Sequence, residues 1–316
     1  MKELINRITI TGELVKNDLK EFKTNNGEEA IGGDLILRTA DGSEHQVNFF
    51  SYKYKKDNNG NFTSETTYFY EKYLEAIETL KDSEHCGEGE RPDIISITDG
   101  CFVTNDYKGQ NGDVISTNRI SARFINRVQP KDYESTVLEA KFEVEGIIAS
   151  IEDEIVKNVP TGNLVVTLNA IRQRQTDYTK NESYEADSLV PIKMIVDKSM
   201  ANAFRSAGYY EGAFTKFIGV LVNTVEFIKT IEKQNFGEDV ERVVKNYVRK
   251  NEIKSGSAVS TIFEHELTQE IVDMLIAQRK QTLYEIKNGI KKNNNSNVSE
   301  STPAPKINYN PFAQIN

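Results

Sequence analysis

Aromatic and cationic side chains are combined in four short stretches of the sequence, at residues 50–56, 107–108, 119–127 and 172–184. Aromatic rings can stack on unpaired nucleobases, each contributing roughly 1–3 kcal/mol, while cations beside them follow a phosphate backbone. The pattern therefore points to a single-stranded nucleic acid as ligand. Its candidate contact residues are Phe50, Tyr52, Lys53, Tyr54, Lys55, Tyr107, Lys108, Arg119, Arg123, Arg172, Arg174, Tyr178, Lys180 and Tyr184.

Each stretch also has a purely structural interpretation. Phe50, Tyr52 and Tyr54 could pack under a helix, because aromatic residues are common in strands. The arginines at 119, 123 and 127 could form an exposed face paired with carboxylates. The segment 172–184 could be a solvated loop.

Residues that would indicate catalysis or a metal site are not arranged in known patterns. The sequence holds no glycine-rich phosphate loop. His265-Glu266 lacks the second histidine of a zinc-protease helix, and the spacing of His45, His85-Cys86 and Cys101 matches no common zinc site. We therefore expect a protein that is not an enzyme and needs no cofactor or metal.

Composition limits how a ligand could be held. The formal net charge of −9 argues against binding through bulk positive charge. It does not argue against cations gathered in a groove, since charges act within a Debye length of about 10 Å. Residues 1–14 lack the apolar core of a signal peptide, and two cysteines fit a reduced, cytoplasmic protein.

Apolar residues alternate with period two along most of the chain, which predicts strands. The clearest unit is 142–171, two strands around a charged loop, and residues 7–39 repeat this design with Gly12 at the place of Gly146. The predicted strands are 7–15, 34–39, 44–54, 93–104 and 116–128, followed by 142–152, 163–171, 188–196, 214–231 and 239–250. Helices are predicted at 68–80 and 198–207, each between the third and fourth strands of its set.

This order resembles the OB fold, a five-stranded barrel that binds oligonucleotides or oligosaccharides. We therefore expect a mainly β (α+β) protein with two tandem OB-like five-stranded barrels, at 1–130 and 140–252. A C-terminal amphipathic helix is expected within 258–290, with a capping box at Thr261 and Glu264. The helix could cover a barrel edge of its own chain or pack between chains as an oligomerisation helix.

Residues 291–316 are rich in Asn, Ser and Pro, and we expect this tail to be disordered. Tandem OB-like units, an amphipathic helix and a tail ending near Pro311-Phe312 resemble single-stranded DNA-binding proteins, particularly those of phages and plasmids. The resemblance implies coating and protection of single-stranded DNA during replication, recombination and repair, in the host cytoplasm if the protein is phage-encoded. It also implies docking of replication or recombination proteins at Pro311 and Phe312.

The tail departs from the family pattern in one respect, because 291–316 contain Lys291, Lys292 and Lys306 against Glu300 alone. The acidic residues that accompany Pro-Phe in the bacterial family are missing, which puts partner docking in doubt. Two other functions fit the same elements: a structural or virion assembly protein, and an RNA-binding regulator on the same fold.

Overall fold

The structure is a computed structural model of the 316-residue chain. It describes residues 1–57, 59–175, 184–232, 236 and 240–290, although not the side chains of 226–232 and 240–247. The predicted disordered tail at 291–316, the candidates Tyr178 and Lys180, and the docking residues Pro311 and Phe312 lie outside the described residues. Of the helices described, none is long and apolar enough to cross a membrane.

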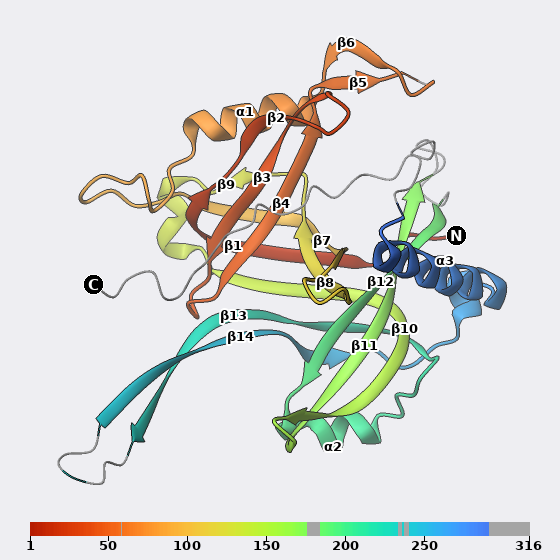
Figure 1. Cartoon of the computed structure of the whole chain (residues 1–316). Helices are drawn as coiled ribbons and strands as arrows, with labels where there is room; N and C mark the ends of the chain where they lie inside the picture. Colours follow the sequence, from red (N-terminus) through yellow and green to blue (C-terminus); the bar gives the residue numbers. More distant parts are fainter. Residues whose placement is uncertain (58, 176–183, 233–235, 237–239, 291–316) are drawn as a thin grey trace.

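The first half of the chain forms a closed five-stranded barrel (Figure 1). Its strands are β1 (Asn6–Asn17), β3 (Glu29–Arg38), β4 (Glu44–Tyr52), β7 (Ile94–Lys108) and β8 (Val114–Ser121). β1 pairs antiparallel with both β3 and β7, β3 with β4, and β7 with β8. A parallel pairing of β4 with β8 closes the ring. Helix α1 (Tyr68–Thr79) lies between β4 and β7 in the chain.

The second half repeats this topology. Its strands are β10 (Glu139–Val156), β11 (Val159–Gln175), β12 (Tyr184–Val196), β13 (Phe214–Glu232) and β14 (Val240–Gly256), with helix α2 (Lys198–Ser206) between β12 and β13. β10 pairs with β11 and β13, and the parallel contact of β12 with β14 closes this barrel. Two rings with the strand order of an OB barrel therefore confirm the predicted fold class.

Gly12 and Gly146 occupy equivalent places in the two barrels. A Cβ atom at Gly12 would lie 2.8 Å from the carbonyl oxygen of Arg38 on the second strand of its barrel. At Gly146 it would lie 2.4 Å from the carbonyl oxygen of Asn169, again on the second strand. The shared requirement is the close approach of two backbones where the first strand coils to close the ring.

Smaller elements extend the barrels. They are β2 (Lys20–Lys23), which pairs with β3, the hairpin β5 (Tyr54–Lys56) with β6 (Phe62–Thr66), β9 (Asn126–Arg127), which pairs with β7, and the 3₁₀ helices η1 (Pro130–Ser135) and η2 (Ile262–His265). Helix α3 (Gln269–Asn288) completes the described part of the chain.

Two predicted elements differ from the structure. The strand predicted at 116–128 is divided, because β8 ends at Ser121 and the chain resumes pairing only at β9. The helix predicted from Thr261 is also divided. The capping box of Thr261 and Glu264 caps the short η2, Glu266 adopts a left-handed conformation with φ 59°, and α3 begins afterwards at the cap of Thr268.

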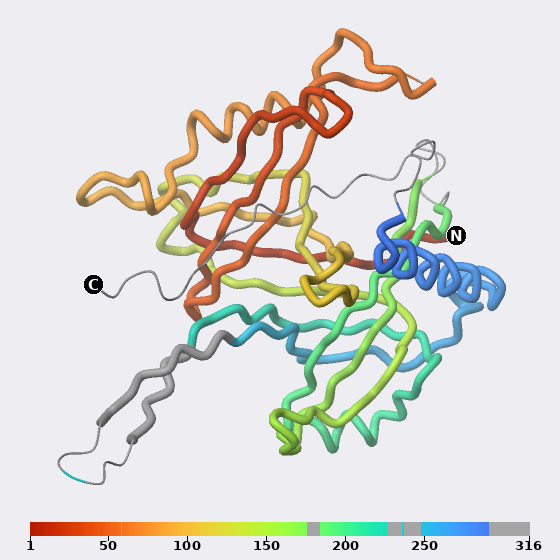
Figure 2. Tube along the Cα trace, viewed as in Figure 1, coloured from red at the N-terminus to blue at the C-terminus, as the bar shows by residue number. Residues whose placement is uncertain are grey.

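The two barrels are joined through their first strands, since β1 pairs antiparallel with β10 from Asn6 opposite Val144 to Thr11 opposite Glu139. The N-terminal segment then runs beside the β11–β12 hairpin, where the amide of Leu4 donates to Gln173 Oε1 at 2.6 Å. Figure 2 shows the N-terminus beside α3 at this end of the second barrel. α3 packs on its own chain, with Val272 and Leu275 buried in an apolar cluster.

Candidate nucleic-acid interface

An aromatic cluster covers part of the outer face of the first barrel. Along β4, Val47 and Phe49 point into the core, so Phe50 and Tyr52 point outward and are half-buried. Their ring centroids lie 4.9 Å apart in an edge-to-face arrangement. Phe22 of β2 lies 6.2 Å from Phe50, and Phe62 of β6 lies 5.2 Å from Tyr52. The two central rings are therefore outside the barrel core and are held by aromatic neighbours.

Lysine side chains surround this aromatic cluster. Lys53 forms an ion pair with Glu29 at 3.1 Å, and Lys55 forms one with Glu65 at 2.5 Å. The ammonium of Lys56 lies 5.0 Å from the ring centroid of Tyr52 and 4.6 Å from that of Phe62. Exposed ion pairs contribute about 0–1 kcal/mol, so a phosphate can replace either carboxylate at little expense.

Tyr54 lies in β5, just beyond the end of β4. Its ring centroid is 5.4 Å from the ammonium of Lys53, which also lies 5.8 Å from the ring centroid of Tyr70 on α1. Lys53 therefore lies near both of these rings.

A groove of about 930 Å³ lies between the two barrels, and we call it the inter-barrel groove. Its walls are the N-terminal segment with the start of β1, the middle of β7, the end of β8 and the ends of β11 and β12. The candidate residues Arg123, Arg172 and Tyr184 all line it, and so does Arg7 of β1. The groove therefore gathers cations from both barrels and the half-buried ring of Tyr184, with the buried Phe102 in its wall.

The cations of the inter-barrel groove are only loosely held by carboxylates. Arg123 Nε lies 3.7 Å from Asp99, and Arg172 Nε lies 3.8 Å from Asp187. Arg7 has no ion-pair partner within the described part of the chain. Asp99 is itself held at a shift in the β1–β7 register, where its carboxylate accepts the backbone amides of Arg123 and Phe124.

The pKa values of two side chains in the groove are shifted by burial and by neighbouring charges. Burial raises the pKa of the Cys101 thiol, and the charges of Arg172 and Arg123 oppose this shift. Burial and the carboxylate of Glu3 raise the pKa of Tyr184. Both arginines therefore act on the same point of the groove wall, and both titratable groups remain neutral near pH 7.

The remaining arginine candidates lie elsewhere. Arg119 is half-buried in β8, and its Nε is buried without a hydrogen-bond partner in the part of the chain that the structure describes. Arg127 of β9 forms an ion pair with Asp93, with 2.7 Å between Nη2 and Oδ1. Arg174 lies outside the groove, and its Nη2 is 3.3 Å from Glu185 Oε2. Because β8 ends at Ser121, the predicted continuous arginine face at 119, 123 and 127 is wrong.

Tyr107 and Lys108 lie at the end of β7 in the β7–β8 hairpin, which is docked on the second barrel. Asp106 forms a buried ion pair with Arg279 of α3, whose Nη2 is 2.8 Å from Asp106 Oδ1. The side chain of Asn118 on β8 donates to the carbonyl of Pro191 on β12 at 3.0 Å. This docking separates Tyr107 from the aromatic cluster and places it near α3, where its side chain is 46% exposed.

The sequence interpretation missed Phe22, Phe62 and Arg7 as contact residues. Phe22 and Phe62 are single aromatic residues within polar segments, and this isolation was the available signal. Arg7 was recognised only as the first residue of a strand. Its place in the groove depends on the pairing of β1 with β10, which no local pattern reveals.

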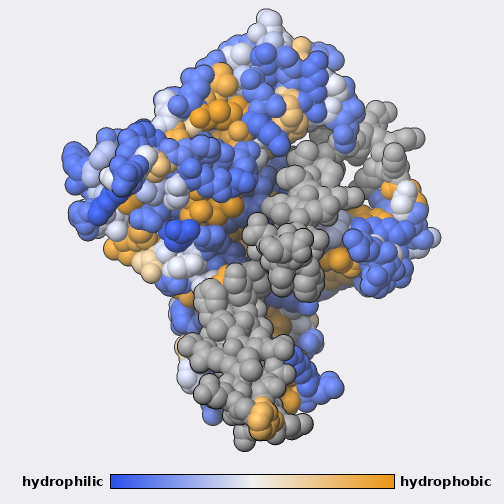
Figure 3. Space-filling view, turned by 60° about the vertical axis from the view of Figure 1, so that its left-hand side comes forward, coloured by the Kyte–Doolittle hydropathy of each residue, from blue (hydrophilic) through white to orange (hydrophobic). Residues whose placement is uncertain are grey.

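On the face shown in Figure 3 the surface is mostly hydrophilic, with separate apolar patches between the polar areas. Among the residues that the structure describes, no group of three or more His, Cys, Asp or Glu side chains could hold a metal ion. The aromatic cluster and the inter-barrel groove present rings, guanidinium groups and ammonium groups, with the carboxylates of Glu3 and Asp99 also in the groove wall.

Solved structures that are similar to this chain include the following three. The wild-type single-stranded DNA-binding protein of Thermus aquaticus is 12% identical, with a TM-score of 0.45, and the match covers 82% of this chain and 94% of that one. A deletion mutant of the same protein, also 12% identical, gives 0.41 over 80% and 93%. A replication protein A heterotrimer bound to single-stranded DNA is 14% identical and gives 0.22 over 78% and 49%.

Sequence comparison gives a more direct result. No curated protein matches the chain. One family model, described as YorF, matches residues 4–289, which is most of the chain. The protein therefore belongs to the YorF family.

Proposed function

We propose that this protein binds single-stranded DNA without sequence preference. The observation that carries the proposal is the inter-barrel groove, where Arg7 and Arg123 of the first barrel meet Arg172 and Tyr184 of the second. Cations fixed along a groove follow a phosphate backbone, and rings beside it accept bases. A chain with net charge −9 can bind a polyanion here because its cations are gathered locally.

The aromatic cluster favours a single strand over a duplex. The rings of Phe50 and Tyr52 lie on the outer face of β4, where unpaired bases could stack on them. Bases inside a duplex are already stacked on each other and do not offer their faces. Every base has a π-face, so stacking of this kind tolerates any sequence.

The biological role follows from this activity as a further part of the proposal. A protein that coats single-stranded DNA protects the intermediates of replication, recombination and repair, and this is the role that we propose. Docking of replication or recombination proteins at Pro311 and Phe312, and association of chains through 261–290, remain predictions.

Competition binding tests the proposal directly. A labelled oligothymidylate is bound to the full chain, and unlabelled poly(dT), poly(rU) and duplex DNA compete for it at several salt concentrations. We expect poly(dT) to compete better than duplex, with affinity falling as salt rises because phosphate contacts release counterions. Equal competition by duplex would contradict the proposal. Stronger competition by poly(rU) would favour an RNA-binding regulator, and no binding would favour a structural role.

A further inference from the structure

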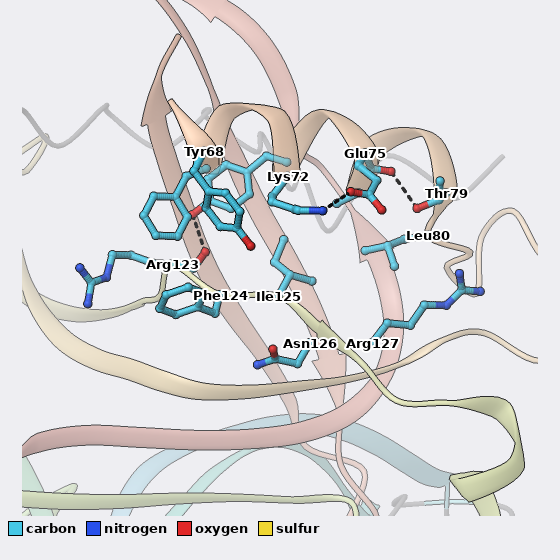
Figure 4. Close-up of a pocket in the computed structure, with 13 residues that line it drawn as sticks. Tyr68, Lys72, Glu75, Thr79, Leu80, Arg123, Phe124, Ile125, Asn126 and Arg127 are labelled. Carbon is cyan, nitrogen blue, oxygen red and sulfur yellow. Dashed lines mark hydrogen bonds and ion pairs between the residues drawn. The ribbon is translucent and has the colours of Figure 1, made fainter. Parts of the chain in front are cut away.

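A second cavity lies at the end of the first barrel, and we call it the α1 crevice. It has a volume of about 330 Å³ and runs between α1 and residues 123–127, which comprise β9 and the segment before it. Figure 4 shows Tyr68 and Phe124 together at one end, with Leu80 and Arg127 at the other. Arg123 and Arg127 of the predicted arginine face line this crevice, and none of the other predicted binding residues that the structure describes does.

Arg123 lines both the α1 crevice and the inter-barrel groove. Its backbone is fixed on both sides, because its amide donates to Asp99 at 3.0 Å and its carbonyl accepts the hydroxyl of Tyr73 at 2.8 Å. Its side chain is 71% exposed. Ser121 and Ala122 face the groove, whereas Phe124 and Ile125 face the crevice. The two cavities are therefore adjacent, with Arg123 at their junction.

The chemistry of the α1 crevice is aromatic with balanced charge. Tyr68 is 57% exposed and Phe124 is 42% exposed, although both are large rings. Each makes an edge-to-face contact with Phe69, at 5.4 Å and 5.3 Å. The cations Lys72 and Arg127 are paired with Glu75 and Asp93, each at 2.7 Å. A ligand here would gain more from stacking than from charge.

We propose that the α1 crevice is a second stacking site for single-stranded DNA, occupied by the nucleotides that leave the inter-barrel groove past Arg123. This proposal rests on the proposed function, because the crevice would hold a further part of the DNA strand that the groove binds. Tyr68 and Phe124 are exposed and supported by Phe69, and the guanidinium of Arg123 lies 5.9 Å from the ring centroid of Phe124. Bases could therefore stack on the exposed parts of these rings, while the same arginine gives the connecting phosphate a cation. The bound strand thus covers the α1 end of the barrel as well as its outer face.

The length of the bound strand provides the test. Oligothymidylates from about 4 nucleotides, the smallest site of one OB barrel, to about 32, twice the largest, are titrated against the parent protein and the variants Tyr68→Ala and Phe124→Ala. We expect affinity for the long oligonucleotides to fall about fivefold or more per lost ring, with the shortest unaffected. Tyr68→Phe keeps the ring and should bind like the parent.

Tyr210→Ala is the matched control, because Tyr210 is also 57% exposed and lines neither cavity. Photocrosslinking of iodouracil-labelled long oligonucleotides to the unmodified protein gives an independent readout, with crosslinks expected in 68–80 or 124–127. If long and short oligonucleotides bind the variants as they bind the parent, and crosslinks stay in the groove, the crevice proposal is wrong while the proposed function stands. Failure of the parent to bind any oligonucleotide would remove both.

Discussion

The two barrels share one topology but treat the same outer face differently. On the first barrel, the outer face of β4 carries Phe50 and Tyr52, half-buried and bordered by rings from β2 and β6. On the second, the middle of the corresponding strand β12 is covered by other parts of the chain. Its Leu189 is buried in a cluster with α3, and the carbonyl of Pro191 accepts a hydrogen bond from β8.

This difference shows that the closed ring does not decide which surface remains available to a ligand. The peripheral elements decide it, since β2 and β6 enlarge the face of β4 while α3 and the β7–β8 hairpin occupy that of β12. The second barrel then contributes to the inter-barrel groove through the ends of β11 and β12, with Arg172 and Tyr184.

The largest expected effect is on stability, and it comes from removing the ion pair that joins the β7–β8 hairpin to α3 over β12. Arg279 is 13% exposed and Asp106 is 7% exposed, so Arg279→Ala leaves a buried carboxylate without its partner. We expect the free energy of unfolding to fall by about 3–5 kcal/mol, measured by urea denaturation. Lys280→Ala, which changes an exposed cation on the same helix, is the control and should change stability little.

The double variant Arg279→Met, Asp106→Leu sharpens this test. Replacing both charges with apolar groups removes the desolvated carboxylate, so part of the lost stability should return. A single variant as stable as the parent would show that the hairpin does not depend on this ion pair to stay on the second barrel.

The next largest effect is on DNA binding by the outer face of β4. Replacing Tyr52 or Phe50 with Ala should weaken binding of oligothymidylate by roughly 1–3 kcal/mol for each base that stacks there, with little change in salt dependence. Fluorescence anisotropy at two salt concentrations measures both quantities. Tyr284→Ala on α3, 58% exposed, is the matched control. If either variant loses its cooperative melting transition, the rings support the fold and the binding face lies elsewhere.

The sequence predicted the strands because each one buries a single face. Val166 and Leu168 on β11 alternate with half-buried neighbours, and this period-two pattern is visible without knowing what lies opposite. The helix boundary at Thr261 was wrong for an equally local reason. The capping box is real, but the left-handed Glu266 that ends η2 is not a glycine and gives no sequence signal.

The candidate site was less accessible to prediction, because its parts meet through pairing of distant segments. Arg7 and Arg172 line one groove only after β1 has paired with β10 and the N-terminal segment has bonded to Gln173. Phe22 reaches Phe50 only through β2 pairing with β3. Residue type identified cations and rings correctly as candidates, whereas their grouping depended on long-range contacts.

A buried histidine near the contact between the barrels makes stability depend on pH. His45 is 3% exposed in the first barrel, and the preceding residues Ser43 and Glu44 accept hydrogen bonds from Asn223 of β13. The pKa of His45 is lowered from 6.5 to about 4, mainly by burial; the charge of Asp41 opposes this shift and the charge of Arg249 adds to it.

The unfolded chain, with the ordinary histidine pKa, therefore binds more protons than the folded one between pH 6.5 and 4. The stability contribution is complete above pH 6.5 and is lost as the pH falls through this window. Between pH 7 and 5 we expect a loss of about 2 kcal/mol from this group. Urea denaturation of His45→Gln at both pH values should show a correspondingly smaller loss, provided that the variant folds at pH 7. An identical pH dependence would mean that other groups cause it.

The smallest expected effect tests whether the covered barrel still contributes to binding. Arg172 lines the inter-barrel groove, whereas Arg174, two residues further along β11, lies outside it beside Glu185. Arg172→Ala should reduce the slope of log affinity against log salt by about 0.7, the value for one phosphate contact on a single strand. Arg174→Ala should leave the slope nearly unchanged.

Arg205→Ala, which breaks an exposed 2.6 Å ion pair with Asp153 away from the groove, controls for the loss of one positive charge from the whole protein. If all three variants shift the slope equally, only net charge matters and the groove has no special part in binding. If Arg172→Ala alone shifts it, the second barrel contributes to binding through the end of β11 although its β12 face is covered.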